Sequence, residues 1–270
     1  RPTRSANLQF EVAGGPFHYW RFRMPEIAAM VGWTNDTVTI DQLRASFYQG
    51  RLDGRFRVDI SPGDRTPFQF EVRAARADFH ELLSDVNSPT NQVEGDLTVD
   101  LAITDADARD WQSWRGFGQA ELIDGFLWDI PMVGIFSPVL NSVLPGVGKS
   151  RIGGATATFT ITNSIVHTDD LELRAPWFRL AYRGTSDFDG RIKARVEARL
   201  LRDAWVIGPL VSAVFSPLTK VLEYEVTGTL GQPRLELMYI PKPLLAPFNP
   251  LRTLREMFQN KPSQIPPPGP

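Results

Sequence analysis

Apolar and polar side chains alternate one by one along much of this 270-residue chain. In the segment RLDGRFRVDI, residues 51–60, the apolar side chains all fall on one side and the charged side chains on the other. This period of two residues is typical of half-buried β-strands. It returns in PFQFEVRA, GDLTVDLAI, ATATFTI, GRIKARVEARL and LEYEVTGTL. The pattern predicts about ten to twelve strands in an antiparallel sheet with one polar and one apolar face.

Short groups of turn residues separate the expected strands. Aspartate and glycine are favoured in tight hairpin turns because they tolerate the backbone angles that these turns require. The groups are Asp53-Gly54, Ser61-Pro62-Gly63, Asp124-Gly125 and Asp189-Gly190. They predict a meander in which each strand pairs with the next.

Three segments replace the alternation with helical spacing. Residues 77–86 include Asp78 as an N-cap, and residues 131–144 open with a proline suited to a first helical turn. The third segment is 204–222. The last two share a Phe-Ser-Pro sequence, which makes them either two equivalent flaps or a coincidence. We expect these short amphipathic helices to cover part of the apolar face.

The charge balance argues against a dedicated nucleic-acid-binding protein. The chain has 29 Lys and Arg against 31 Asp and Glu, whereas such proteins usually carry a basic excess. The basic side of residues 190–200 faces carboxylates such as Glu197 and Glu225 on equivalent strand faces. We expect it to be a solvated outer face and predict no nucleic-acid partner. The absence of cysteine excludes disulfides and fits either redox compartment.

Motifs that resemble catalytic or ligand sites are incomplete. LPGVGKS ends like a phosphate loop, but its first glycine is missing and a helical pattern precedes it. The DADARD segment resembles a calcium loop without its turn glycine or final glutamate, so we expect a solvated loop. The three histidines share no metal-ligand spacing. A glycosidase-like carboxylate pair stays open as an alternative, but we predict no enzyme, no metal and no cofactor.

The chain opens RPTRSANLQF, without an initiator Met or a signal peptide, so we expect a piece of a longer protein. Its longest apolar stretches, near 126–144 and 204–222, are broken by proline and polar residues. They fall short of the roughly 20 apolar residues that span a bilayer. From residue 240 onward the chain is rich in proline, which predicts an extended tail after a domain boundary near Tyr239.

Residues 116–236 have a layout that resembles a known family. GFGQAELIDGFLWDIPMVGIFSPVL combines a Gly-x-Gly strand, an Asp-Gly turn and an amphipathic helix, and YEVTGTLGQPRLE closes the segment. The turn G…DFDG lies between them. This layout resembles the C-terminal region of the AsmA-like family, the superfamily of AsmA, TamB and YhdP. ASFYQGRLDGRFRVDI and VEGDLTVDLAI are similar to the repeating strand units upstream in that family.

The resemblance implies an AsmA-like β-groove domain over residues 1–239, with an upstream strand unit at 36–115 and a C-terminal unit at 116–239, followed by the tail at 240–270. It implies a long curved antiparallel sheet that forms a U-shaped groove or partly open barrel, with a few short helices capping the apolar face. It also implies a periplasmic protein of the Gram-negative cell envelope, tethered to the inner membrane by a segment absent from this chain. The implied partners are phospholipid acyl chains, membranes and envelope proteins.

The resulting hypothesis is a non-enzymatic module that holds or conducts lipid in envelope lipid transport or outer-membrane biogenesis. Its lipid contacts, assigned by alternation, are Phe56, Val58, Ile60, Phe68, Phe70, Val72, Leu97, Val99, Leu101, Phe159, Ile161, Ile192, Val196 and Leu200. Its gating helices contribute Ile135, Phe136, Val139, Leu140, Val214 and Phe215. The alternative is a structural or protein-interaction module in which the same side chains form a closed, dry β core.

Overall fold

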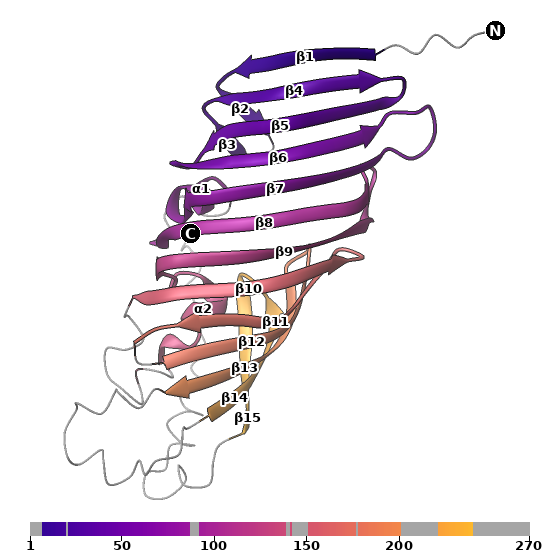
Figure 1. The fold of residues 1–270 in the computed structure, drawn as a ribbon. Helices are drawn as coiled ribbons and strands as arrows, with labels where there is room; N and C mark the ends of the chain where they lie inside the picture. The colour runs from indigo at the N-terminus through magenta and orange to yellow at the C-terminus, as the bar shows by residue number, and fades with distance from the viewer. Residues whose placement is uncertain are drawn as a thin grey trace, which may run out of the picture.

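The computed structural model describes residues 7–19, 21–86, 92–138, 141, 151–176, 178–200 and 221–239. Within them, 13 strands form one long antiparallel sheet (Figure 1). Their order is β1 (Asn7–Gly14), β4 (Ile27–Thr34), β5 (Thr37–Phe47), β6 (Gly50–Asp59), β7 (Pro67–Asp78), β8 (Glu94–Asp107), β9 (Asp110–Phe126), β10 (Ile152–Thr162), β11 (Ile165–Arg174), β12 (Phe178–Asp187), β13 (Arg191–Leu200), β14 (Val221–Thr229) and β15 (Gln232–Tyr239). The predicted fold class is confirmed: the protein is mainly β, and β1 and β15 do not pair to close a barrel.

The register explains why the alternation runs so far along the chain. Residues paired across neighbouring strands share one face of the sheet. One row of paired residues crosses all 13 strands without a charged side chain, and we call it the apolar row. Its members are Phe10, Val31, Ile40, Phe56, Phe70, Ile103, Gly116, Ile161, Val166, Ser186, Ile192, Gly228 and Pro233. We call the face that carries it the apolar face.

The opposite face, which we call the polar face, has a matching row from β6 to β15. It runs through Arg55, Glu71, Ala102, Phe117, Thr160, His167, Thr185, Lys193, Thr227 and Arg234. Charged and hydroxyl side chains dominate this row because it faces water. Each strand therefore contributes to both faces at once, as a period of two requires.

Two of the predicted turns are wrong. Asp53-Gly54 lies in the middle of β6, and Asp124-Gly125 lies inside β9, where Asp124 adopts a φ of 54°. Gly54 is needed for close packing, because a Cβ there would lie 2.7 Å from the carbonyl oxygen of Glu71. The hairpin before β6 turns instead at Tyr48, which has a positive φ of 45°. The expected strand number was also too low, since the described residues form 15 strands.

The other predicted turns hold. Residues 61–63 form the loop between β6 and β7, and Asp189-Gly190 forms the turn between β12 and β13. At this turn Gly190 has a φ of 80°, which glycine adopts without steric cost. Strand β15 reaches Tyr239, the last described residue, and the predicted tail at 240–270 lies outside the described residues.

Three elements lie on the apolar face, behind the sheet in Figure 1: the hairpin of β2 (Phe17–Tyr19) and β3 (Phe22–Met24), helix α1 (Phe79–Val86) and helix α2 (Pro131–Gly134). Helix α1 matches the predicted segment 77–86. The backbone N–H of Glu81 donates to Asp78 Oδ1 at 2.9 Å, which confirms Asp78 as the N-cap.

The other two helix predictions fare differently. Helix α2 ends at Gly134 and is followed by an i+3 turn from Phe136 N–H to the Val133 carbonyl. Within the predicted segment 131–144, Ser137, Pro138 and Asn141 are again helical, and 139–140 and 142–144 lie outside the described residues. The predicted segment 204–222 lies outside the described residues except for its last two, which belong to β14. The second Phe-Ser-Pro sequence, at 215–217, also lies outside them.

Candidate functional site

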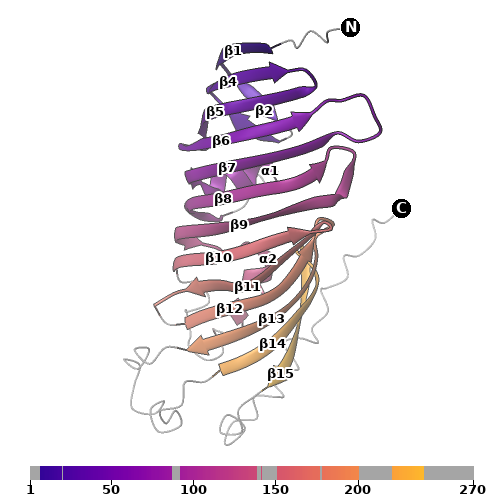
Figure 2. The ribbon, with the colours of Figure 1, turned by 45° about the vertical axis from the view of Figure 1, so that its right-hand side comes forward.

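The apolar face is closed where β10–β14 curl around the segment Leu127–Phe136, which we call the plug (Figure 2). Phe136 at the end of the plug is 0% exposed. Its ring meets those of Tyr182 and Tyr224 edge-on, with centroids 6.0 and 5.4 Å apart. Trp128 at the other end packs on Phe178 at 5.7 Å. The C-terminal half of the apolar face is therefore a packed core.

Burial in this core perturbs the two tyrosines of β12 and β14. The apolar surroundings disfavour a phenolate, so burial raises the pKa of Tyr182 and of Tyr224 above the ordinary tyrosine value. Both phenols stay neutral at physiological pH. The core around the plug is thus uncharged.

Several predicted lipid contacts belong to this core. Val196 is fully buried and Ile192 nearly so, and Leu97 packs against the same cluster from β8. Leu200 lies opposite Phe178 in the register of β13 and β12. The structure thus places the side chains of Leu97, Ile192 and Val196 beside protein rather than in an open groove.

The predicted gating residues divide in the same way. Ile135 and Phe136 belong to the plug and pack in the core. The remaining four lie outside the described residues: Val139, Leu140, Val214 and Phe215.

The N-terminal half of the apolar face, on β1 and β4–β8, is more open, and we call it the trough. The hairpin and α1 reach only one end of its strands, where Met24 and Leu82 pack against Ala45 and Ala74. Seven predicted contacts lie farther along these strands and remain partly exposed: Phe56, Val58, Phe68, Phe70, Val72, Val99 and Leu101. The structure brings these seven together on one surface. Ile60 lies just past the end of β6 and is exposed.

An aromatic ladder lines the end of the trough near the hairpin turns. The rings of Phe56, Phe68 and Phe70 stack with centroids 5.8 to 6.3 Å apart. Trp114 of β9 meets Phe68 edge-on at 5.2 Å, and Trp111 stacks on Trp114 at 4.9 Å. Such pairs stabilise the fold beyond their buried area. The ladder gives the trough a rigid apolar wall.

A glycine of β9 leaves room for an aromatic ring on the apolar face between the trough and the core. Gly118 of β9 lies on the apolar face beside Phe159, whose ring passes over it. A Cβ at Gly118 would lie 2.5 Å from Phe159 Cζ and 2.5 Å from the Asp100 carbonyl oxygen. The Gly-x-Gly sequence therefore lets Phe159 lie flat across the sheet, next to buried Ile161.

Sequence reasoning missed the first strands of the trough. Leu8, Phe10 and Val12 of β1 are all exposed on the apolar face, and Trp33 of β4 is exposed beside them. The signal was present, since NLQFEVAG alternates in the same way as the segments that were recognised.

Polar contacts join β3, the turn before β6 and helix α1 at the covered end of the trough, and we call this group of contacts the latch. The Tyr48 hydroxyl donates to Asp85 Oδ2 of α1 at 2.9 Å, and the Arg23 guanidinium of β3 pairs with the same oxygen. The Arg23 backbone N–H also donates to the Tyr48 hydroxyl oxygen at 3.3 Å. Desolvation raises the pKa of Tyr48. Desolvation would also raise the pKa of Asp85, but the hydrogen bonds from Arg23 and Tyr48 outweigh it and hold this pKa below its usual value.

The latch predicts a specific loss of stability in acid. Because the folded-state pKa of Asp85 is lowered, its contribution is present above the unfolded-state pKa of about 4 and is lost as the pH falls through the folded-state value. Asp85→Asn should lower the thermal midpoint at pH 7 by about 2–4 °C, as expected for roughly 1 kcal/mol. The gap between the two proteins should narrow as the pH falls below about 4. A gap that is unchanged at pH 3 in a thermal melt contradicts this assignment.

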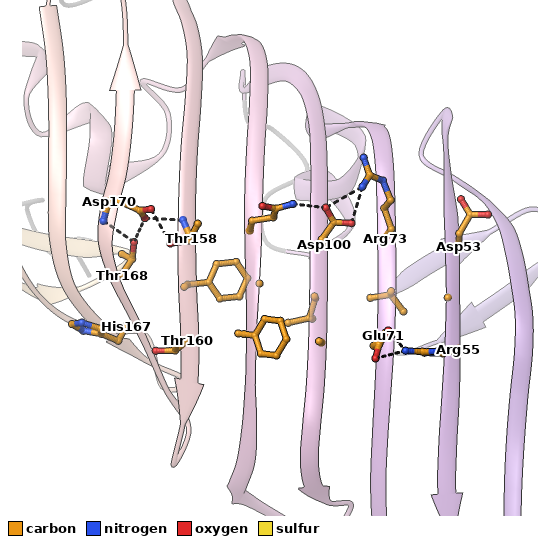
Figure 3. A pocket seen from close by; sticks show the side chains of 18 of the residues that line it. Asp53, Arg55, Glu71, Arg73, Asp100, Thr158, Thr160, His167, Thr168 and Asp170 are labelled. Carbon is orange, nitrogen blue, oxygen red and sulfur yellow. Dashed lines mark hydrogen bonds and ion pairs between the residues drawn. The ribbon is translucent and has the colours of Figure 1, made fainter.

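A hollow with a volume of about 1130 Å³ lies on the polar face, across β5–β11 (Figure 3). Most of the predicted lipid contacts lie on the other side of the sheet, although Val72, Leu101 and Phe159 also border this hollow. Its side chains are mostly paired with one another. Arg55 pairs with Glu71 at 2.7 Å, Arg73 with Asp100 at 3.2 Å, and Thr158 donates to Asp170 at 2.8 Å. Such cross-strand pairs are ordinary for a solvated sheet face.

The basic side of β13 is balanced as the sequence predicted. Glu197 pairs with Arg199 at 2.6 Å and with Arg183 at 3.6 Å, and Arg191 pairs with Asp187 at 3.3 Å. These residues lie on the polar face, on a strand whose other side faces the core. The β13 strand therefore has one solvent-exposed polar side and one buried apolar side.

The DADARD segment forms the turn between β8 and β9, but Asp107 is buried rather than solvated. Its Oδ1 accepts the backbone N–H groups of Arg109 at 3.0 Å and Thr66 at 3.2 Å, and its Oδ2 accepts from Arg65. The N–H of Arg109 and these other donors hold the pKa of Asp107 below its usual value, against desolvation. This carboxylate ties two neighbouring loops together, where a solvated loop was expected.

None of the described helices is long and apolar enough to cross a membrane. The geometry thus offers two different surfaces. The trough suits a ligand without hydrogen-bonding groups, whereas the polar face is solvated and its side chains pair with one another. Comparison with family models, curated proteins and solved structures finds no match for this chain.

Proposed function

We propose that this protein is a non-enzymatic lipid-binding module whose trough holds acyl chains. The observation that carries the proposal is the apolar row, which crosses 13 strands without a charged side chain and is only partly buried over β4–β7. At a spacing of about 4.8 Å per strand, the accessible part of the row, from β1 to β7, is about 19 Å long. A long, uncharged and accessible strip suits a ligand that is itself long and apolar.

The energetics fit a conduit or a carrier. Burial of an acyl chain is worth roughly 0.8 kcal/mol per methylene, so about 16 carbons contribute on the order of 12 kcal/mol relative to water. A membrane offers the same chain a similar environment. Exchange between membrane and trough is therefore near neutral, and lipid can enter and leave.

The resemblance to the AsmA-like family supports the biological setting of the proposal. In that setting the module serves envelope lipid transport or outer-membrane biogenesis in the periplasm of a Gram-negative bacterium, with phospholipid as its cargo. A tether to the inner membrane and envelope protein partners belong to the same proposal.

The alternative of a structural or interaction module has one observation in its favour, the packed core around the plug. That core occupies the C-terminal half, where Val196 and Phe136 are fully buried. The trough over β4–β8 is partly exposed and is not part of it. We therefore assign the packed half to stability and the trough to lipid.

Native mass spectrometry of the purified chain tests the proposal. We expect phospholipid to co-purify, and the delipidated chain to take up phospholipid from vesicles of phosphatidylethanolamine and phosphatidylglycerol. The bound mass should be released by detergent that competes for the trough. A lipid-free spectrum together with no uptake from these vesicles would overturn the proposal.

A further inference from the structure

The accessible part of the apolar row ends abruptly between β7 and β8. Phe56 and Phe70 are partly exposed, whereas Ile103 of β8, the next member of the row, is only 2% exposed. Ile161 of β10 is also buried and belongs to the same cluster as Ile103. The apolar row therefore passes at this point from an accessible surface into packed protein.

An indole ring stands crosswise to the aromatic ladder at the same place. The rings of Phe68 and Phe70 are nearly parallel, with an interplanar angle of 2°. Trp114 of β9 meets them at 81° and 79°, with centroids 5.2 and 6.4 Å away. Trp114 also meets Phe188 of the β12–β13 turn edge-on at 6.0 Å. Contacts from β7 and from this turn thus hold the indole in its orientation.

A second row of the apolar face lies beside the apolar row and is covered from β9 onward. Its register joins Val72, Leu101, Gly118 and Phe159 across β7–β10. Val72 and Leu101 are partly exposed. At Gly118 the space is taken by the ring of Phe159, because a Cβ there would lie 2.5 Å from Phe159 Cζ. Two neighbouring rows are therefore closed within two strands of each other.

We propose, on the basis of the proposed function, that Ile103, Trp114 and Phe159 form an end wall at which the methyl end of a bound acyl chain stops. None of the three side chains carries a charge. A carboxylate or phosphate pressed against this wall would lose water without gaining a charged partner, which is costly. A methyl group has no such loss, so the methyl end is the one that faces β8. The trough is thus closed at this end and selects acyl chains by length.

Phe159 is the member of the end wall that is best suited to substitution. It is partly exposed, whereas Ile103 is buried. Phe159→Ala removes the ring that covers Gly118 and frees about one strand spacing of 4.8 Å. An extended chain advances about 1.2 Å per bond, so this space holds roughly four more methylenes.

A series of saturated fatty acids of increasing length tests the end wall by titration calorimetry. In the unmodified protein, each added methylene should raise the affinity about fourfold until the methyl end reaches the wall, after which the affinity should level off. In Phe159→Ala the rise should continue for roughly four more methylenes. Levelling at the same length in both proteins, or no levelling in either, overturns the proposal.

Phe117→Ala is the matched control for the length series. Phe117 is the same residue type one strand away, but it lies on the polar face, opposite Thr160, and is exposed. Its variant should level off at the same length as the unmodified protein. A longer limit in Phe117→Ala as well would show that the limit does not come from the end wall.

Tryptophan fluorescence gives a second measurement that keeps an aromatic ring in the wall. A fatty acid brominated at its methyl end should quench Trp114, and part of this quenching should disappear in Trp114→Phe. A fatty acid brominated beside its carboxyl group should be quenched equally little or much in both proteins. The same loss with both probes overturns the orientation. A chain that binds none of these fatty acids overturns the proposed function together with the end wall, whereas binding without a length limit overturns the end wall alone.

Discussion

Replacing Phe136 with alanine is expected to lower the free energy of unfolding by about 3–5 kcal/mol, the usual cost of truncating a buried phenylalanine. Phe136 is fully buried, and its ring fills the space between Tyr182 and Tyr224. The loss combines the burial of the ring with a cavity that the surrounding strands cannot fill, because a curved sheet holds both tyrosines in place. Urea denaturation followed by tryptophan fluorescence measures the change.

Phe117→Ala is the matched control for this experiment. Phe117 is the same residue type in the same sheet, but it lies on the polar face and is 57% exposed. Its truncation should change the free energy of unfolding by no more than about 0.5 kcal/mol. If Phe136→Ala costs as little as its control, the plug is a loosely held gate and the C-terminal half is not a packed core.

Phe70→Asp is expected to weaken binding of a fatty-acid probe by at least about 100-fold, or roughly 2.7 kcal/mol. Phe70 lies in the apolar row of the trough, stacked with Phe56 and Phe68 and partly exposed. A carboxylate there would have to give up its water to an acyl chain that offers no partner, which is costly. Because the position reaches solvent when the trough is empty, the fold should persist, as judged by circular dichroism.

The matched control is again on the other face. Phe117→Asp introduces the same charge on the polar face of the sheet, where carboxylates such as Glu71 already lie in solvent. It should change the affinity for the probe by less than about twofold, well below one tenfold step of about 1.4 kcal/mol. Equal losses in the two variants would show that the probe does not occupy the trough, and a larger loss in Phe117→Asp would move the site to the polar hollow.

The fold was predictable because β-sheet alternation is a local property. Each strand of RLDGRFRVDI type shows its two faces without reference to any other segment, so the antiparallel sheet and its two faces follow from the sequence. The turns were less predictable. Asp53-Gly54 matches a hairpin sequence, yet its glycine answers a packing demand from the neighbouring strand β7, which no local pattern shows.

The candidate site, like the turns, was only partly predictable from the sequence. Alternation placed Phe70 and Val196 on one face, and the register puts them there. It treated them alike, however, although Val196 is fully buried beneath the plug and Phe70 is partly exposed in the trough. The segment that makes this difference is residues 127–136, which lies far from both in sequence.

The sequence by itself determined the class of fold, the two faces of the sheet and the side of each strand that meets water, because these depend on a repeat of two residues. Only the tertiary structure decided which part of the apolar face is a core and which part is a trough. That decision depends on the curl of β10–β14 around the plug. The curl arises from contacts between residues far apart in the chain, and a periodic pattern carries no information about them.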